Sequence, residues 1–204
     1  NFLETVMIKE YQISNFKPFA DAATIPIRPI TLIFGANSSG KSSIFQSLLL
    51  LKQTIDDAES PEPTLIAKGS LVDLGSYGEL IHRHDLQTPV FFKITAQRPD
   101  HLLDTLPYEE YLSNMHNVHE DFEKLNASGD FNTIGLGVTF SYKSSNSVNV
   151  SKLELYLGEN SAPFFIYENG VPDERHPKAV HFHYESSPKS IFKLQGVNIY
   201  HQYW

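Results

Sequence analysis

One glycine-rich stretch of this 204-residue chain combines a lysine with several serines, and these residue types at this spacing could bind phosphate groups. It reads Gly-Ala-Asn-Ser-Ser-Gly-Lys-Ser over residues 35–42 and matches the pattern G-x-x-x-x-G-K-[ST]. A short apolar run precedes it and an amphipathic pattern follows it, which is the strand–loop–helix context in which this pattern cradles nucleotide phosphates. The alternative is a glycine-rich turn that only joins a strand to a helix, and the context disfavours it.

The backbone of this stretch is expected to supply an anion site. Gly35 and Gly40 allow backbone angles and a close approach that a Cβ atom would prevent, so successive N–H groups can point inward at a β-phosphate. The helix that begins here adds its N-terminal partial positive charge. Besides the two glycines, the residues expected to surround the phosphates are Asn37, Ser38, Ser39, Lys41 and Ser42.

Three side chains add specific chemistry to this anion site. Lys41 can deliver a full positive charge to the β- and γ-phosphates and is the expected catalytic residue. Ser42 offers a hydroxyl to Mg²⁺, and Ser43 offers one to the α-phosphate. The expected ligands are therefore Mg²⁺ and a nucleoside triphosphate such as ATP, although the loop itself does not specify the base.

Two elements must position the loop. Residues 30–34, Ile-Thr-Leu-Ile-Phe, form a nearly unbroken apolar run that predicts a strand buried on both faces of a parallel sheet. A helix is predicted after Gly40, because apolar residues then recur every three or four positions. Its expected apolar face comprises Ile44, Leu48, Leu51 and Ile55, widened by Phe45 and Leu49.

Most of the remaining chain has the alternating pattern of antiparallel strands. Residues 7–13 and 22–27 predict an opening hairpin, and Pro26 and Pro29 limit its second strand to an edge or a bend. A shift of the apolar phase between Val150 and Leu153 predicts a bulge. The other predicted elements are a loop with a short helical turn at 64–88, strands at 90–97, 136–142, 147–157, 163–168, 179–185 and 190–199, and a helix at about 107–127.

These elements predict an α/β fold, namely a P-loop NTPase lobe with a central strand–loop–helix unit and an antiparallel β-subdomain. We expect an extension or vector remnant at 1–6, the hairpin, loop and first helix at 7–60, and a connecting loop with the β-subdomain at 61–204. A Walker B strand would end in an aspartate, and the nearest stretch, which ends at Asp73, is too short. The lobe is therefore expected to be incomplete without a C-terminal lobe.

Composition limits the classes of function. The net charge is −8, which disfavours a stand-alone, sequence-neutral nucleic-acid binder. The chain has no cysteine, and no apolar run approaches the roughly 18 residues that cross a bilayer, so we expect a cytoplasmic protein without a membrane partner. Nine histidines invite a metal interpretation, but exposed surface is the favoured one. The pairs in question are His82 with His84 and His116 with His119.

The region around the phosphate loop resembles the N-terminal lobe of ABC-type ATPases of the RecF, SMC and OLD kind. In that group a strand ends in an Asn-Phe-Lys step, a second strand returns, and a P-loop with Asn as its third residue follows. The resemblance covers about residues 7–55. The matching positions are Asn15, Phe16 and Lys17, then Gly35, Asn37, Ser39, Gly40, Lys41 and Ser42.

The resemblance implies a composite ATPase. A C-terminal lobe would carry the Walker B and signature elements, ATP would lie between two copies, and hydrolysis would need both. This sequence lacks those elements, which implies an N-lobe fragment or a split subunit. DNA or a nuclease is a possible partner, in DNA repair or in defence against foreign DNA.

The resemblance also assigns residues outside the loop. Asn15 and Lys17 would line the base and ribose, although a strand end with a packed phenylalanine is an equally good interpretation of this step. A glutamine after the helix would contact Mg²⁺, and Gln97 is preferred over Gln87 for this position.

Two other functions stay open on the sequence. One is an interaction module that senses ATP without hydrolysing it. The other is a self-contained P-loop kinase or small NTPase, which would need its own Walker B carboxylate and lid within these 204 residues.

Overall fold

The computed structural model describes residues 7–57, 65–98, 127, 132–143, 148–158, 162–163 and 165–168. The predicted helix at about 107–127, apart from Ala127, and the predicted strands at 179–185 and 190–199 lie outside these residues. The division of the chain near residue 60 stays a prediction, and the described residues on both sides of it contribute to one sheet and one hydrophobic cluster.

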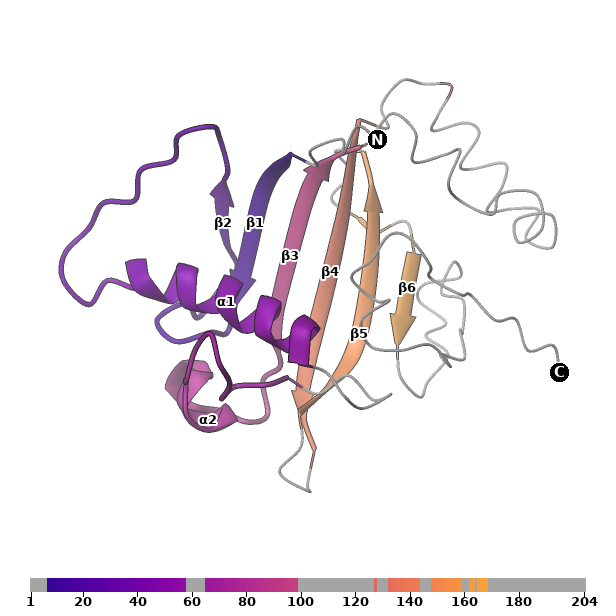
Figure 1. Cartoon of the computed structure of the whole chain (residues 1–204). Helices are drawn as coiled ribbons and strands as arrows, with labels where there is room; N and C mark the ends of the chain where they lie inside the picture. The colour runs from indigo at the N-terminus through magenta and orange to yellow at the C-terminus, as the bar shows by residue number, and fades with distance from the viewer. Residues whose placement is uncertain are drawn as a thin grey trace, which may run out of the picture.

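The described strands form one antiparallel sheet in the order β2-β1-β3-β4-β5-β6 (Figure 1). Alternating apolar residues let each strand bury one face, and this confirms the predicted opening hairpin and the predicted strands up to residue 168. Together with helix α1 on one face, the sheet confirms the α/β class. The strands are β1 (Ile8–Ser14), β2 (Ala23–Pro26), β3 (Val90–Gln97), β4 (Thr133–Tyr142), β5 (Val148–Leu157) and β6 (Phe165–Glu168).

The predicted bulge lies in β5 at Ser151. Thr139 pairs with Lys152 and Phe140 pairs with Val150, so Ser151 has no partner in the register between β4 and β5. Its hydroxyl donates to the Thr139 carbonyl oxygen at 3.3 Å. The extra residue reverses the alternation of sides along the strand. The apolar side chains before and after Ser151 can therefore face the same side of the sheet.

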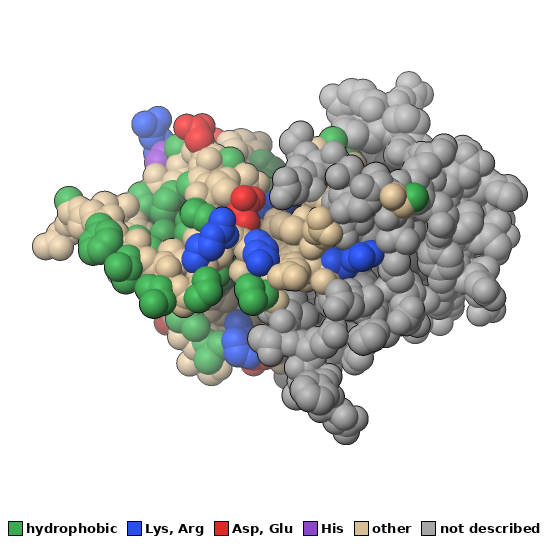
Figure 2. Space-filling view, turned by 90° about the horizontal axis from the view of Figure 1, so that it is seen from above, with side chains coloured by type: hydrophobic (Ala, Val, Ile, Leu, Met, Phe, Trp, Pro, Cys, Tyr) green, Lys and Arg blue, Asp and Glu red, His purple; other side chains and the backbone are tan. Residues whose placement is uncertain are grey.

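The strand predicted at 30–34 is wrong for the described structure. These residues form no ladder, and Ile30, Leu32 and Phe34 are 80%, 70% and 85% exposed. A strand needs a neighbour for its backbone N–H and C=O groups, and no described strand runs alongside in parallel. Seen from above, hydrophobic side chains follow the left and lower rim of the described surface (Figure 2).

Helix α1 (Lys41–Asp57) crosses one face of the sheet, as Figure 1 shows, and confirms the helix predicted after the glycine-rich loop. Tyr11 on β1 donates a hydrogen bond to the Ser47 hydroxyl at 2.8 Å, and Ser47 donates to the Ile44 carbonyl oxygen at 2.7 Å. Burial raises the pKa of Tyr11 well above its usual value. This buried chain of hydrogen bonds fixes how α1 is rotated on the sheet.

The buried face of α1 contains fewer apolar residues than its sequence predicts. Phe45 and Leu49, which were expected to widen the apolar face, are 59% and 39% exposed. Their apolar character therefore marks a second, uncovered face of the helix. The buried residues are Ser43, Ile44, Ser47, Leu50, Leu51, Gln53 and Thr54.

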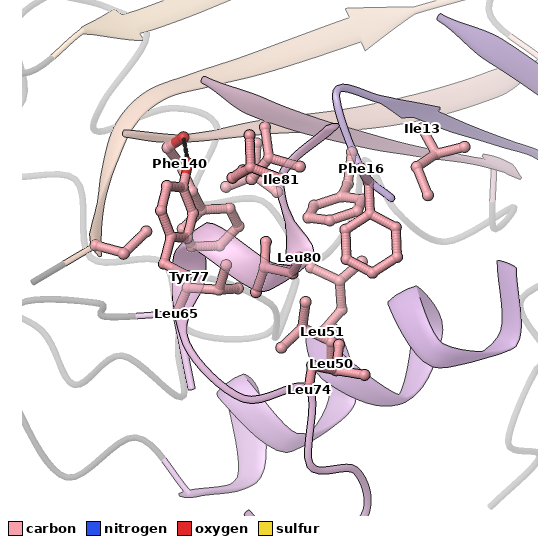
Figure 3. Packing of buried hydrophobic residues seen from close by; sticks show 14 of the residues in the cluster. Ile13, Phe16, Leu50, Leu51, Leu65, Leu74, Tyr77, Leu80, Ile81 and Phe140 are labelled. Atoms are coloured by element: carbon pink, nitrogen blue, oxygen red, sulfur yellow. Dashed lines mark hydrogen bonds between the residues drawn. The ribbon is translucent and has the colours of Figure 1, made fainter. Parts of the chain in front are cut away.

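The core lies between α1, the sheet and the segment around the short helix α2 (Tyr77–Leu80). Figure 3 shows Leu50 and Leu51 of α1 directed toward Leu80, while Phe140 of β4 lies next to Tyr77. The Tyr77 hydroxyl donates to the Phe140 carbonyl oxygen at 3.0 Å, and burial raises the pKa of Tyr77 to about 12.

The segment before β3 contains the short helical turn that the sequence predicts. Ser76 caps α2 and exchanges bonds with Glu79 in a capping box, so the Ser76 amide and hydroxyl lower the pKa of Glu79. A 3₁₀ turn (His82–His84) follows. Among the described residues no helix combines the length and the apolar character that crossing a membrane requires.

Two neighbouring leucines test which side of α1 faces the sheet. Leu50→Ala should lower the free energy of unfolding by about 2–5 kcal/mol, because Leu50 is fully buried and its removal leaves a cavity. Leu49→Ala makes the same chemical change one residue earlier and should cost less than about 1 kcal/mol. Urea denaturation of both variants measures the difference, and equal costs would contradict this orientation of the helix.

Candidate functional site

The glycine-rich loop lies against the turn that follows β1. Gly40 has a φ of +94°, and a Cβ atom built on it would come within 2.5 Å of the Pro18 Cγ atom. Only glycine fits both the left-handed backbone and this close approach. Ser38 also has a left-handed backbone, with a φ of 61°, which turns the chain into the start of α1.

A pocket opens at the N-terminus of α1. It is lined by Pro18, Ser38, Gly40, Lys41, Ser42 and Ser43. The structure thus brings together five of the predicted phosphate-binding residues and adds one proline. Gly35, Asn37 and Ser39 belong to the same loop, and a Cβ atom on Gly35 would lie 2.7 Å from the Ser39 hydroxyl oxygen. Their contacts with phosphate stay a prediction.

Lys41 folds back over its own loop. Its ammonium group donates to the carbonyl oxygens of Gly35 at 2.8 Å and Ala36 at 2.5 Å. Lys41 is the only cationic residue that lines the pocket in the described part of the chain. An incoming anion would take the ammonium group from these two carbonyls, exchanging neutral acceptors for a charged one.

The electrostatics of the pocket favour an anion for two reasons. The first N–H groups of α1 have no partner within the helix, and their dipoles add a partial positive charge there. The first turn of α1 contains no acidic side chain that would oppose this charge.

Asn15 does not face the pocket, and its expected contact with the base and ribose is corrected. The residue is buried, and its amide nitrogen donates to the carbonyl oxygens of Thr88 at 2.6 Å and Pro89 at 3.2 Å. Both amide hydrogens therefore hold the segment before β3 against the end of β1.

Lys17 lies beside α1 without lining the pocket. Its ammonium group donates to the Gln46 side-chain oxygen at 2.9 Å, about one turn along the helix from Ser42. A role of Lys17 at the ribose stays a prediction.

The turn after β1 is held by the 3₁₀ turn before β3. Lys17 donates its backbone N–H to the Leu80 carbonyl oxygen at 2.8 Å, and His82 Nδ1 lies 2.7 Å from the Lys17 carbonyl oxygen. Left-handed backbones at non-glycine residues concentrate in these two turns, at Asn15, Lys17, Arg83 and His84. Such backbones persist only where the surroundings fix them, so this side of the pocket is firmly built.

Gln97 is corrected as the Mg²⁺-contacting glutamine. It ends β3, where its backbone N–H donates to the Met7 carbonyl oxygen, whereas the loop lies next to the opposite end of the sheet, where Ser14 pairs with Phe91. Gln97 lies six positions after Phe91 on the strand, which is about 20 Å. Gln87, the other candidate, is exposed on the turn that Asn15 holds.

Asp73 does not end a strand. Its carboxylate accepts from the Gly75 N–H at 3.0 Å and lies 3.4 Å from the Lys68 ammonium group, and the Gly75 amide and Lys68 lower its pKa. It is therefore a turn residue.

Histidines give no metal site in the described part of the chain. Within that part no three His, Cys, Asp or Glu side chains are grouped as metal ligands. The Nδ1 atoms of His82 and His84 lie at hydrogen-bonding distance from backbone carbonyl oxygens. His116 and His119 lie outside the described residues.

Sequence reasoning missed Pro18, which lines the pocket, Gln46, which bonds Lys17, and Gln53, which lies farther along α1. Pro18 directly follows the Asn-Phe-Lys step. The signal that could have found it is Gly40, because a glycine at that position leaves room for the proline ring. Nothing in the helical pattern singles out Gln46, which is half-buried, or Gln53, which is a buried polar residue on the face expected to be apolar.

Replacing Asn15 separates a structural role from a ligand-binding one. Asn15→Ala should lower the free energy of unfolding by about 1–3 kcal/mol, because two carbonyl oxygens lose their donor and alanine tolerates the left-handed backbone poorly. Asn15→Gly, which relieves only the backbone, should recover part of the loss. The folded variants should bind Mg-ATP within about twofold of the parent, measured by calorimetry. A stable variant that no longer binds would make Asn15 a ligand.

Comparison with known proteins identifies the family of the chain. A family model described as AAA ATPase domain matches residues 7–196, nearly the whole chain. The match includes the glycine-rich loop, α1 and every described strand. No curated protein matches the chain.

Proposed function

The chain belongs to the AAA ATPase domain family, and from this premise we propose that it binds Mg-ATP at the loop of residues 35–42. In this proposal it is the N-terminal lobe of an ATPase of the ABC and SMC-like kind. The observation that carries the proposal is the pocket at the start of α1, where Gly40 presses against Pro18 and Lys41 is the lining cation.

The pocket residues suit the parts of Mg-ATP. The N–H groups at the start of α1 would surround the β-phosphate, and Lys41 would leave the Gly35 and Ala36 carbonyls to bind the β- and γ-phosphates. Ser42, which is exposed on the first turn, would give its hydroxyl to Mg²⁺. Ser43, on the inner side of the same turn, would bind the α-phosphate.

Removing the charge of Lys41 tests this proposal. Lys41→Ala should weaken Mg-ATP binding by about 100-fold or more, since a charge-assisted contact to phosphate is lost and no other cation among the described residues lines the pocket. Calorimetric titration of Mg-ATP and Mg-ADP measures the effect. Lys52→Ala is the matched control, because Lys52 lies on the same helix, is exposed and pairs with Asp56. Equal binding by the parent and Lys41→Ala would refute the site.

Hydrolysis is proposed to need a second lobe. Among the described residues no carboxylate lines the pocket, and ATP hydrolysis requires one to hold Mg²⁺ and a group to orient water. A C-terminal lobe would bring these groups, and a second copy would close over the nucleotide. The resemblance further favours a DNA or nuclease partner and a role in DNA repair or in defence against foreign DNA.

The uncovered apolar surface supports such a lobe. Ile30, Leu32 and Phe34 lead into the loop, and Phe45 and Leu49 lie on the face of α1 that the sheet does not cover. Exposed apolar residues at this density mark a contact surface. A lobe that supplies parallel strands beside residues 30–34 would cover the outer face of α1 as well, leaving α1 between two sheets.

A charge on this surface should suppress association of the isolated chain. The parent chain is expected to self-associate, and Leu32→Lys should shift it toward monomer in light scattering, because a lysine cannot be buried without cost. Ala22→Lys adds the same charge at an exposed position outside the surface and should change nothing. A parent chain that is monomeric at high concentration would contradict the docking surface.

The absence of a lining carboxylate in the described residues also keeps a second function in view. A nucleotide sensor would bind Mg-ATP and turn none over even with the second lobe added. Turnover in that mixture distinguishes the ATPase from the sensor. A self-contained kinase is disfavoured, because Asp73 is engaged in a turn.

A further inference from the structure

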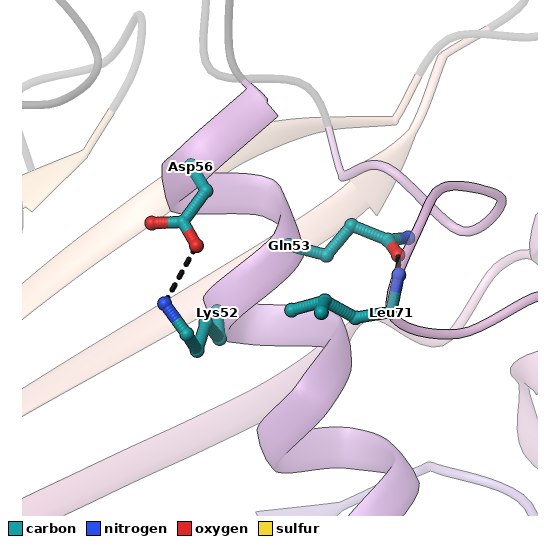
Figure 4. Close-up of polar contacts among 4 residues, drawn as sticks. All are labelled: Lys52, Gln53, Asp56 and Leu71. Atoms are coloured by element: carbon teal, nitrogen blue, oxygen red, sulfur yellow. Dashed lines mark hydrogen bonds and ion pairs between the residues drawn. The ribbon is translucent and has the colours of Figure 1, made fainter.

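Gln53 is a fully buried glutamine that joins α1 to the segment of residues 66–72. Its Nε2 atom donates to the Ile66 carbonyl oxygen at 2.8 Å. Its Oε1 atom accepts from the backbone N–H groups of Leu71, as Figure 4 shows, and of Val72, both at 2.9 Å. One side chain thus bonds both ends of the segment.

The segment is shaped to receive this glutamine. A Cβ atom at Gly69 would overlap the Gln53 amide, so the chain passes close against it. The neighbouring Thr54 hydroxyl oxygen accepts from the Ile66 N–H at 3.1 Å. Three contacts from Gln53 and one from Thr54 therefore tie the segment to the second half of α1.

Helix α1 connects this segment to the phosphate pocket. Ser43 in the pocket and Gln53 are ten residues apart on one continuous helix, which is about 15 Å. A helix of this length moves as a rigid body, so a displacement of its N-terminus reaches Gln53. When phosphate binds, Lys41 must leave the Gly35 and Ala36 carbonyls, and this change at the first residue of α1 would start a shift of the whole helix by about 1–2 Å, with its contacts to the turn and the sheet kept.

We propose that Gln53 is a positioning residue that passes the nucleotide state of the pocket to segment 66–72. The proposal rests on the proposed binding of Mg-ATP and adds a regulatory path to that site. In this arrangement the backbone of residues 71 and 72 follows α1, because two of its N–H groups are held by the Gln53 oxygen.

Leu71 is the exposed residue through which a displacement of the segment would reach the surface. It is 43% exposed, and Figure 4 shows its side chain directed toward α1, beside Gln53. It therefore adds an exposed apolar side chain next to the helix that also carries the exposed Phe45 and Leu49. A lobe docked on this helix would meet an apolar side chain whose position changes with the nucleotide.

Hydrogen exchange of two backbone amides tests the proposal. In the wild-type chain, Mg-ATP should change the exchange rates of the Leu71 and Val72 amides by about threefold or more. Gln53→Leu removes all three bonds, so these amides should exchange about tenfold faster and lose their response to Mg-ATP. Calorimetry on the same samples should give a Mg-ATP affinity within about twofold of the parent, because the pocket is unchanged.

Two further variants separate this role from a merely structural one. Gln53→Glu keeps the oxygen that accepts from both amides but replaces the donor to the Ile66 carbonyl by an acceptor, so it should loosen residue 66 and still retain most of the response at residues 71 and 72. Lys52→Ala changes the adjacent exposed residue, which pairs with Asp56, and should leave the response intact. If Gln53→Leu does not fold, the wild-type measurement and Gln53→Glu still decide the matter.

The outcomes distinguish this proposal from the proposed function. A wild-type chain that does not bind Mg-ATP in calorimetry overturns both. A chain that binds Mg-ATP with no change at the two amides, or a Gln53→Leu variant that keeps the full response, overturns the role of Gln53 alone.

Discussion

The close approach of Gly40 to Pro18 joins the start of α1 to the turn that follows β1, and the geometry of the pocket depends on this contact. The turn cannot shift independently, because Asn15 holds the chain before β3 and Lys17 is bonded to the Leu80 carbonyl. The start of the helix is thus placed by a part of the sheet that is itself fixed from two sides. An anion is bound most strongly when the N–H groups already point at its position before it arrives. The contact between Gly40 and Pro18 would hold the N–H groups at the start of α1 in such an orientation.

Helix α1 is held to the sheet and to the segment of residues 66–72 by polar contacts as well as by apolar ones. Hydrogen bonds are directional, so the buried bond from Tyr11 to Ser47 and the bonds of Gln53 restrict the position of the helix. Contacts between leucines alone would let the helix slide more easily. Hydrophobic burial of Leu50 and Leu51 supplies the free energy, while the polar groups select one rotation and one position of the helix along its axis. The opposite face, with Phe45 and Leu49, has apolar residues and no cover in the described structure.

The sequence predicted the elements whose signals are local. The alternation of apolar and polar residues predicted β3, β4 and β5, because the pattern of each strand reflects its own two faces. The change of phase near Ser151 located the bulge. The loop of residues 35–42 and the helix after it were predictable because glycine, lysine and serine at this spacing are typical of a loop that leads into a helix, whereas phosphate binding there stays a prediction.

The errors arise where the outcome depends on distant partners. The run at 30–34 has the composition of a buried strand, but a strand forms only beside another, and composition does not reveal whether the neighbour is present. Gln97 was chosen because it ends a strand, yet only the pairing of β1 with β3 tells which end of the sheet that is. Asn15 matched a motif whose presence does not tell which way its amide points. Buried glutamines have no periodic signal at all.

The fit of Gly69 against Gln53 has a consequence for how this sequence can diverge. A side chain at position 69 would push the Gln53 amide out of its three hydrogen bonds, so an alanine there fits only if that amide shifts or residue 53 becomes shorter. A shorter residue at position 53 would in turn remove the need for glycine at position 69. The two positions, sixteen residues apart in the chain, should therefore evolve as a pair.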